Sequence, residues 1–288
     1  MNSKANRNLT YACPSCRTLL HEKRCQTCSF AIEWRAVPAY FTQSVNAQRY
    51  REFGCFYDNL YDREERVWSK LAGRGQPFVR FVARQITRGH LGRYLDIGCG
   101  EGFQLEAVAA DEKHGVEISE KAALKAAARA KAKVCLASAE ELPYLDEHFD
   151  ALTSIGVLTH LFDGAAALRE ARRVLRPGGS LVLGVVVQNT AWQGFRSRVA
   201  QLIFVPSTRQ GFARRALRKF RDRFTVSSQG QTARADQQPL ERRFSAGEMD
   251  ELIKSAGFAV DEAITTWTHP VAPLIGPHFR VYILRRHL

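Results

Sequence analysis

The chain has 288 residues, 45% hydrophobic and 25% charged, which is ordinary for a globular protein with one sizeable core plus appendages. Its longest strongly apolar run, Leu181 to Val187, is too short for a transmembrane helix, and the N-terminus lacks the apolar stretch of a secretion signal, so we expect a cytoplasmic protein. The formal charge of +13 favours anionic partners such as nucleic acid, phosphorylated metabolites or an acidic membrane surface.

Two Cys-x-x-Cys pairs stand near the N-terminus, and they contain Cys13, Cys16, Cys25 and Cys28. In a reducing compartment such pairs hold metal more often than they form disulfides. Tetrahedral Zn²⁺ takes four thiolates from two such knuckles, and its binding would order a segment too small to bury a core. The spacing predicts a zinc ribbon over residues 1–36, with a purely structural role as the alternative to a functional one.

The next segment, 37–92, is predicted to be a helical or lid segment that folds onto a larger body. Aromatic residues with interleaved charges run from Trp34 to Trp68. Pro77 suits a first helical turn, and the apolar spacing after it predicts a helix that stops before Gly89. The three cysteines outside the knuckles are expected to be small buried residues without chemistry; they are Cys55, Cys99 and Cys135.

Strands and helices alternate from residue 93 onward, which predicts a parallel sheet covered on both faces. The expected strands are 93–97, 115–118, 134–137, 149–155 and 180–187, with closing strands at 259–266 and 278–285. The expected helices are 103–110, one capped by Ser119 through Lys131, one capped by Asp163 that ends before Pro177, and one that opens on the capping box Ser245–Glu248 and closes at Gly257. We therefore expect an α/β fold, a Rossmann-like seven-stranded, mostly parallel sheet, over 93–288.

A basic insert interrupts this rhythm over residues 188–243. It carries twelve basic and three acidic residues, so most of the chain's excess charge is local. The arginines and the lysine between Arg214 and Arg223 would suit RNA phosphates, whereas Phe212, Phe220 and Phe224 would suit a helix on a membrane surface. A solvated helical face is an equally good reading of the pattern.

The strongest chemical signal is the stretch Tyr94–Gly102, YLDIGCGEG, in which an acid at a strand end precedes glycines at alternate positions. Such a turn lets a ligand approach bare backbone. Glu117 follows Asp96 by 21 residues at the end of the next expected strand, where nucleotide-binding folds place a carboxylate for ribose hydroxyls. The two motifs together predict a nucleotide site, although G-x-G-x-G differs from the dinucleotide pattern G-x-G-x-x-G.

At these residues the sequence resembles the class I S-adenosylmethionine-dependent methyltransferases. The match also includes SAEELP at 138–143, FDAL at 149–152 and VLRPGG at 174–179. The resemblance implies S-adenosylmethionine as cofactor, contacted by Asp96, Gly98, Cys99, Gly100, Glu117, Ile118, Ser138, Ala139 and Glu140. Where the family usually has Asp to accept from the adenine amino group, this chain has Ser138, so the acceptor is weaker or is supplied by Glu140 or a main-chain carbonyl.

The ribbon followed by this domain is similar both to zinc-ribbon ribosomal RNA guanine methyltransferases and to bacterial methyltransferases with an activator-like ribbon. The C-terminal half resembles generic small-molecule methyltransferases, so we expect a small-molecule or lipid-linked acceptor. The alternatives are an RNA base methyltransferase and a non-catalytic scaffold that binds a partner through its ribbon. His160 is a weak candidate for a catalytic base, and Tyr57 and Tyr61 resemble a helix that closes over the cofactor.

Overall fold

The computed structural model describes residues 11–20, 23–42, 44–63, 75–87, 89–188, 239–266 and 278–287. Most of the basic insert, 189–238, lies outside these ranges, as do Trp68 and the segment 267–277. Within the described ranges, no helix is both long enough and apolar enough to cross a membrane.

The core of the fold is a seven-stranded sheet, as the alternation of elements predicts. Its order is β5 (Lys133–Leu136), β4 (Glu112–Glu117), β3 (Arg93–Ile97), β6 (Phe149–Ile155), β7 (Leu175–Gln188), β10 (His278–Arg286) and β9 (Phe258–Thr266). The pairs from β5 to β7 are parallel, while β10 runs antiparallel to both of its neighbours. Three two-residue strands extend this sheet: β1 (Glu33–Trp34), β2 (Pro38–Ala39) and β8 (Phe244–Ser245).

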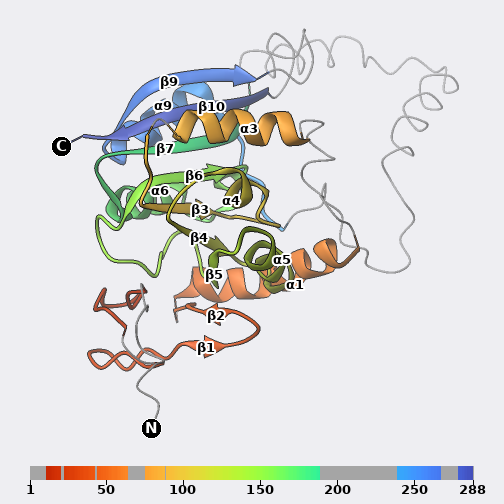
Figure 1. The fold of residues 1–288 in the computed structure, drawn as a ribbon, viewed down its shortest axis with the longest axis vertical. Helices are drawn as coiled ribbons and strands as arrows, with labels where there is room; N and C mark the ends of the chain where they lie inside the picture. Colours follow the sequence, from red (N-terminus) through yellow and green to blue (C-terminus); the bar gives the residue numbers. More distant parts are fainter. Residues whose placement is uncertain are drawn as a thin grey trace, which may run out of the picture.

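Helices cover both faces of the sheet (Figure 1). Helices α3 (Gly75–Ile86), α4 (Phe103–Ala107) and α5 (Glu120–Ala130) contact one another in series, and α1 (Val45–Arg63) packs on α5. Helices α6 (Gly164–Val174) and α9 (Ala246–Ser255) contact each other and the strands β7 and β9. The expected caps are present: Ser119 and Asp163 accept from backbone N–H groups, and Ser245 forms its capping box with Glu248.

Three element boundaries differ from those expected by three residues or more. Strand β4 begins at Glu112 rather than at residue 115, because Glu112 and Lys113 pair with β3. Helix α4 ends at Ala107 rather than at residue 110, because Val108 adopts an extended backbone and is buried in the core. Strand β7 begins at Leu175 rather than at residue 180, since Leu175 pairs with Phe149 and the register then shifts across the Pro177–Gly179 turn. The sequence therefore predicted the turn at Pro177–Gly179, but pairing with the neighbouring strand β6 determined where β7 begins.

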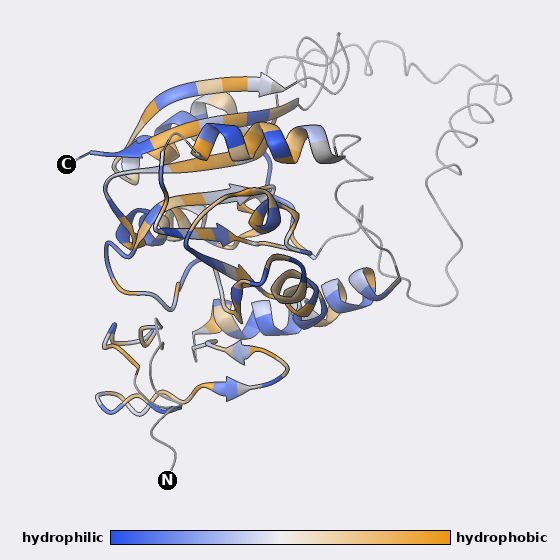
Figure 2. Cartoon of the chain, in the orientation of Figure 1, coloured by the Kyte–Doolittle hydropathy of each residue, from blue (hydrophilic) through white to orange (hydrophobic). Residues whose placement is uncertain are grey.

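The apolar core lies between the sheet and its helices, and Figure 2 shows hydrophobic residues along the central strands. Two of the three cysteines outside the knuckles, Cys99 and Cys135, are buried, as expected. Cys55 is exposed instead, because it lies on the face of α1 that points away from the core. The prediction that all three are buried was therefore wrong for Cys55.

Candidate cofactor and metal sites

The two Cys-x-x-Cys pairs fold into matching knuckles. In the first, Arg17 N donates to Cys13 O at 2.8 Å, and in the second, Ser29 N donates to Cys25 O at 3.1 Å. Arg17 and Ser29, each placed directly after the second cysteine of its pair, both adopt left-handed backbone with φ of 64° and 62°. Non-glycine residues adopt this conformation only at a cost, and here the hydrogen bonds inside each knuckle hold it.

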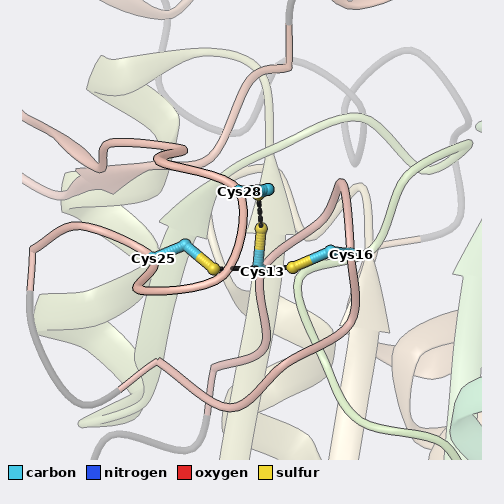
Figure 3. A group of neighbouring side chains, drawn as sticks. All are labelled: Cys13, Cys16, Cys25 and Cys28. Carbon is cyan, nitrogen blue, oxygen red and sulfur yellow. Dashed lines mark hydrogen bonds between the residues drawn. The ribbon is translucent and has the colours of Figure 1, made fainter.

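The four thiol groups meet at one point between the knuckles (Figure 3). All four sulfur atoms lie within 4.8 Å of one another, and the pairs Cys13–Cys28 and Cys16–Cys25 are each 3.4 Å apart. Four thiolates around a tetrahedral zinc ion, with Zn–S bonds of about 2.3 Å, lie roughly 3.8 Å apart. The donor set and its spacing therefore fit a structural zinc ion.

The two thiols of the first knuckle differ in acidity when no metal is bound. Hydrogen bonding with the Thr18 side chain and backbone lowers the pKa of the Cys16 thiol to about 6, whereas burial raises the pKa of Cys13 to about 12. A metal ion bound through these thiolates would displace a proton from Cys13, so its affinity would rise with pH.

The glycine turn connects the end of β3 to α4 and leaves no room for side chains at its first glycine. Gly98 has φ of 69°, and a Cβ atom there would lie 2.3 Å from Cγ2 of Val157. Gly98 N and Cys99 N both donate to Val116 O, which ties the turn to β4. The Cys99 thiol lies beside Gly115 in the core, and it is also 3.9 Å from Gly100 O in the turn.

Glu117, at the end of β4, points at this turn. Its Oε2 accepts from Gly100 N at 2.8 Å, and its Oε1 accepts from Ile118 N at 2.8 Å and Ser119 N at 3.1 Å. Burial raises the pKa of the carboxyl group, and the three backbone donors oppose that shift. The structure thus brings together the two motifs that the sequence separates by 21 residues.

Asp96 forms the second buried carboxylate of the site, at the end of the neighbouring strand β3. Thr153 Oγ1 donates to Asp96 Oδ1 at 2.6 Å and accepts in turn from the Tyr94 hydroxyl. Burial raises the pKa of Asp96 to about 7, opposed by the Thr153 hydrogen bond and reinforced by the charge of Glu117. A cation placed at the turn would offset the cost of burying these two negative charges.

The position of these carboxylates follows from the strand order. The chain order runs outward from β3 to β5 on one side and from β6 to β7 on the other, so it reverses between β3 and β6. In open α/β sheets ligands bind outside the carboxyl ends of the strands at such a reversal. Asp96 and the glycine turn lie at that point.

The loop after β5 carries the expected adenine-edge residues, and its side chains already have partners. Ser138 Oγ accepts from Glu140 N at 3.0 Å. The Glu140 carboxylate accepts from Asn46 Nδ2 at 2.8 Å, from Asp163 N at 2.7 Å and from the Tyr50 hydroxyl. Glu140 therefore fastens α1 and the N-terminus of α6 to this loop, a role that the sequence did not indicate.

Helix α1 lies over the site, and a residue that sequence reasoning missed holds it there. Asp58 Oδ1 accepts from Ser119 Oγ at 2.6 Å and from Lys121 N at 3.0 Å, at the start of α5. Tyr57 and Tyr61 pack on Ala122 in a small apolar cluster. Burial raises the pKa of Tyr57, and the charge of Glu117 adds to this shift.

His160 ends the short helix η1 (Leu158–His160) beyond β6. Its Nδ1 lies 2.7 Å from Leu240 O, a carbonyl that can only accept, so Nδ1 carries a proton and the neutral ring has its lone pair on Nε2. Burial lowers the pKa of His160, which favours this neutral form at neutral pH. The ring is thus a proton acceptor of fixed tautomer.

Known proteins match parts of this chain. Residues 95–183 match the methyltransferase domain family. The 27-O-demethylrifamycin SV methyltransferase of Amycolatopsis mediterranei is 43% identical over 102 residues, 32% of this chain and 38% of that protein. A human protein described as probable tRNA methyltransferase 9B is 35% identical over 133 residues, 44% of this chain and 28% of that protein. The chain therefore spans well under two thirds of the length of these relatives.

A solved structure extends the likeness to most of the fold. An S-adenosylmethionine-dependent methyltransferase from Thermotoga maritima, described as a possible histamine N-methyltransferase, has a TM-score of 0.50 and 25% identity. The superposition covers 81% of this chain and 98% of that chain. On these matches, residues 95–183 resemble a methyltransferase domain, and most of the chain is similar in fold to an S-adenosylmethionine-dependent methyltransferase; four cysteines cluster near its N-terminus.

Proposed function

We propose that the protein is an enzyme that transfers a methyl group from S-adenosylmethionine to a small-molecule or lipid-linked acceptor. The observation that carries the proposal is the Glu117 carboxylate, which is buried and aimed at the backbone of the glycine turn at the reversal of strand order. A buried acid beside bare backbone is what a ribose and a cationic amino-acid group require. The family match over residues 95–183 supports the same conclusion.

The residues of the site would divide the cofactor among them. Glu117 would accept from the ribose hydroxyls, the turn at Gly98–Gly100 would lie under the methionine end, and the loop 138–140 would edge the adenine. S-adenosylmethionine supplies a methyl group that is already activated on a sulfonium. The protein's part is then alignment of the acceptor, which contributes up to about 7–11 kcal/mol, and exclusion of water.

For an acceptor that must lose a proton, His160 is the candidate base. Its Nε2 lone pair is available because Leu240 O holds the proton on Nδ1. An oxygen acceptor needs this assistance more than an amine does. A His160→Gln variant should therefore lose turnover while the dissociation constant for the cofactor stays unchanged.

Two observations bear on the class of acceptor. The relative from Amycolatopsis mediterranei is named for a methyl transfer to a small molecule, which favours the proposed acceptor. The basic excess in 188–243 and the name of the human relative favour RNA as the second candidate. RNA binding through phosphates would weaken steeply with added salt.

One experiment separates these acceptors. The protein is incubated with methyl-labelled S-adenosylmethionine and a cell extract that is then split into RNA, lipid and small-molecule fractions. Label in the lipid or small-molecule fraction supports the proposal, and label in RNA alone supports the second candidate. No cofactor binding at millimolar concentration, measured by calorimetry, would instead support a non-catalytic scaffold.

We also propose that the four knuckle cysteines hold one Zn²⁺. The support is their spacing and the matched knuckle geometry described above. Elemental analysis of the purified chain should find one zinc per molecule, and a chain that folds normally without bound metal would contradict this.

A further inference from the structure

The ribbon packs directly against the methyltransferase domain rather than standing apart from it. In Figure 1 it lies beside the β5 edge of the sheet. Ala12 N donates to Pro143 O at 2.9 Å, so the segment just before the first knuckle binds the loop that follows β5. The Tyr11 ring is 6% exposed and lies 5.4 Å from the ring of Tyr144 and 4.8 Å from that of Tyr40, measured between centroids.

The first knuckle also directs one arginine at that loop. Arg17 follows Cys16, and its backbone is fixed by the hydrogen bond from Arg17 N to Cys13 O inside the knuckle. Its guanidinium forms a two-pronged pair with Glu170 of α6, both N–O distances being 3.0 Å, and Nη1 donates to Leu142 O at 3.1 Å. A planar fork of this kind fixes orientation as well as charge.

Glu170 completes a clamp on the same loop residue. Its Oε2 accepts from Leu142 N at 2.9 Å, so the Arg17–Glu170 pair holds both the N–H and the carbonyl of Leu142. Arg173 also reaches Leu142 O, at 3.0 Å, and pairs with Glu170. The Glu170 side chain is 10% exposed and that of Arg17 is 36% exposed, so the clamp is partly shielded from water.

The clamped residue lies four positions after Ser138, at the far end of the loop expected to edge the adenine. The two ends of this loop are thus held differently: Glu140 ties its start to α1 and α6, and the ribbon ties its end through Leu142 and Pro143. Opening the first knuckle would release Arg17 and Ala12 together. The loop would then lose its contacts on the ribbon side.

We infer that the ribbon is a positioning unit for cofactor binding, in which the first knuckle acts through Arg17 and Glu170 to set the loop 138–143. Arg17 is a positioning residue, and metal in the ribbon and cofactor in the methyltransferase domain bind cooperatively. The inference rests on the proposed function, because it assumes that this loop contacts the cofactor. Coupling between two sites is reciprocal, so each ligand must tighten the other by the same factor.

The test measures cofactor binding by calorimetry on the full chain, with and without prior removal of metal by a chelator. Arg17→Ala should weaken S-adenosylmethionine binding about tenfold, within the range usual for coupled sites. Arg17→Lys keeps the charge but cannot form the two-pronged pair with Glu170, so its affinity for S-adenosylmethionine should lie between those of Arg17→Ala and wild type. Arg24→Ala is the matched control, since Arg24 is an exposed arginine of the same ribbon.

Metal removal should weaken cofactor binding at least as much as Arg17→Ala does, and it should have a smaller effect in the Arg17→Ala background. Hydrogen exchange at Leu142 should be faster in both cases, which reports on the loop without any enzyme assay. Saturating cofactor should slow zinc release from wild type and not from Arg17→Ala.

The outcomes separate this inference from the function on which it rests. Wild-type protein that binds no S-adenosylmethionine would overturn both. Wild-type protein that binds it, with an unchanged dissociation constant in Arg17→Ala and after metal removal, would overturn the positioning role and leave the proposed enzyme standing. An equal loss of affinity in Arg24→Ala would also overturn it, because charge alone would then account for the effect.

Discussion

Replacing Glu117 with alanine tests the cofactor site most directly. The carboxylate accepts three hydrogen bonds, from Gly100 N, Ile118 N and Ser119 N, and the residue is only 8% exposed. A hydrogen bond to a charged acceptor contributes about 1.5–3 kcal/mol, and a buried donor left without a partner costs a similar amount. Loss of the carboxylate removes the support of the turn and, with it, the proposed acceptor for the ribose. We expect cofactor binding to weaken by about 3 kcal/mol or more, at least a hundredfold in the dissociation constant.

The assay is calorimetric titration with S-adenosylmethionine, alongside elemental analysis of zinc. Glu106→Ala is the matched control, because Glu106 is a carboxylate of the adjacent helix α4 that is 51% exposed and pairs with Arg129 only at 3.9 Å. Gly98→Leu should lose binding as well, since its side chain would collide with Val157. Zinc content should stay unchanged in all three variants. Wild-type affinity in both Glu117→Ala and Gly98→Leu would refute the assignment of the cofactor site.

Three further predictions follow from the geometry. Gly102→Ala should lower the free energy of unfolding, measured by urea titration, by about 2–5 kcal/mol. The reason is that φ at Gly102 is 81° and the new Cβ would lie 2.6 Å from Cα of Ala126. Unchanged stability would contradict the packing of α4 on α5. Cofactor affinity should rise with pH by up to tenfold per unit below about pH 7 and level off above it, because burial raises the pKa of Asp96 to about 7 and a bound cation favours the ionised form. Calorimetry in buffers of different ionisation enthalpy would detect the released proton. An affinity that does not change with pH would argue against ionisation of Asp96 on binding. Cys28→Ser should remove bound zinc although Cys28 is exposed, and retained stoichiometric zinc would exclude it as a ligand.

Local signals in the sequence predicted most of the fold. The caps at Ser119, Asp163 and Ser245 act within four residues, so they can be read from the chain alone. Apolar runs separated by amphipathic segments predicted the parallel strands, because strands buried on both faces need no alternation of polar residues. The boundaries of α4 and β7 were not predictable in this way, since pairing with neighbouring strands and burial of Val108 decided them.

The sequence likewise predicted some residues of the candidate site and missed others. Asp96, the glycine turn and Glu117 belong to motifs in which each residue is recognisable from its place at a strand end. Asp58 and Tyr50 carry no such signal, because each contacts the site only after α1 folds back onto it, across 61 and 90 residues of sequence respectively. Their roles depend on packing between elements that the sequence does not relate to each other.

By itself, then, the sequence determined the sheet and its helices, the position of the glycine turn and the grouping of four cysteines. Each of these depends on residues close together in the chain. Only the tertiary structure showed that Glu140 binds α1 through Asn46 and that Leu240 O fixes the tautomer of His160. The same holds for the pair between Arg17 and Glu170, which are 153 residues apart in the sequence. Hydrogen bonds are directional and short, so which distant groups form them depends on how whole elements pack.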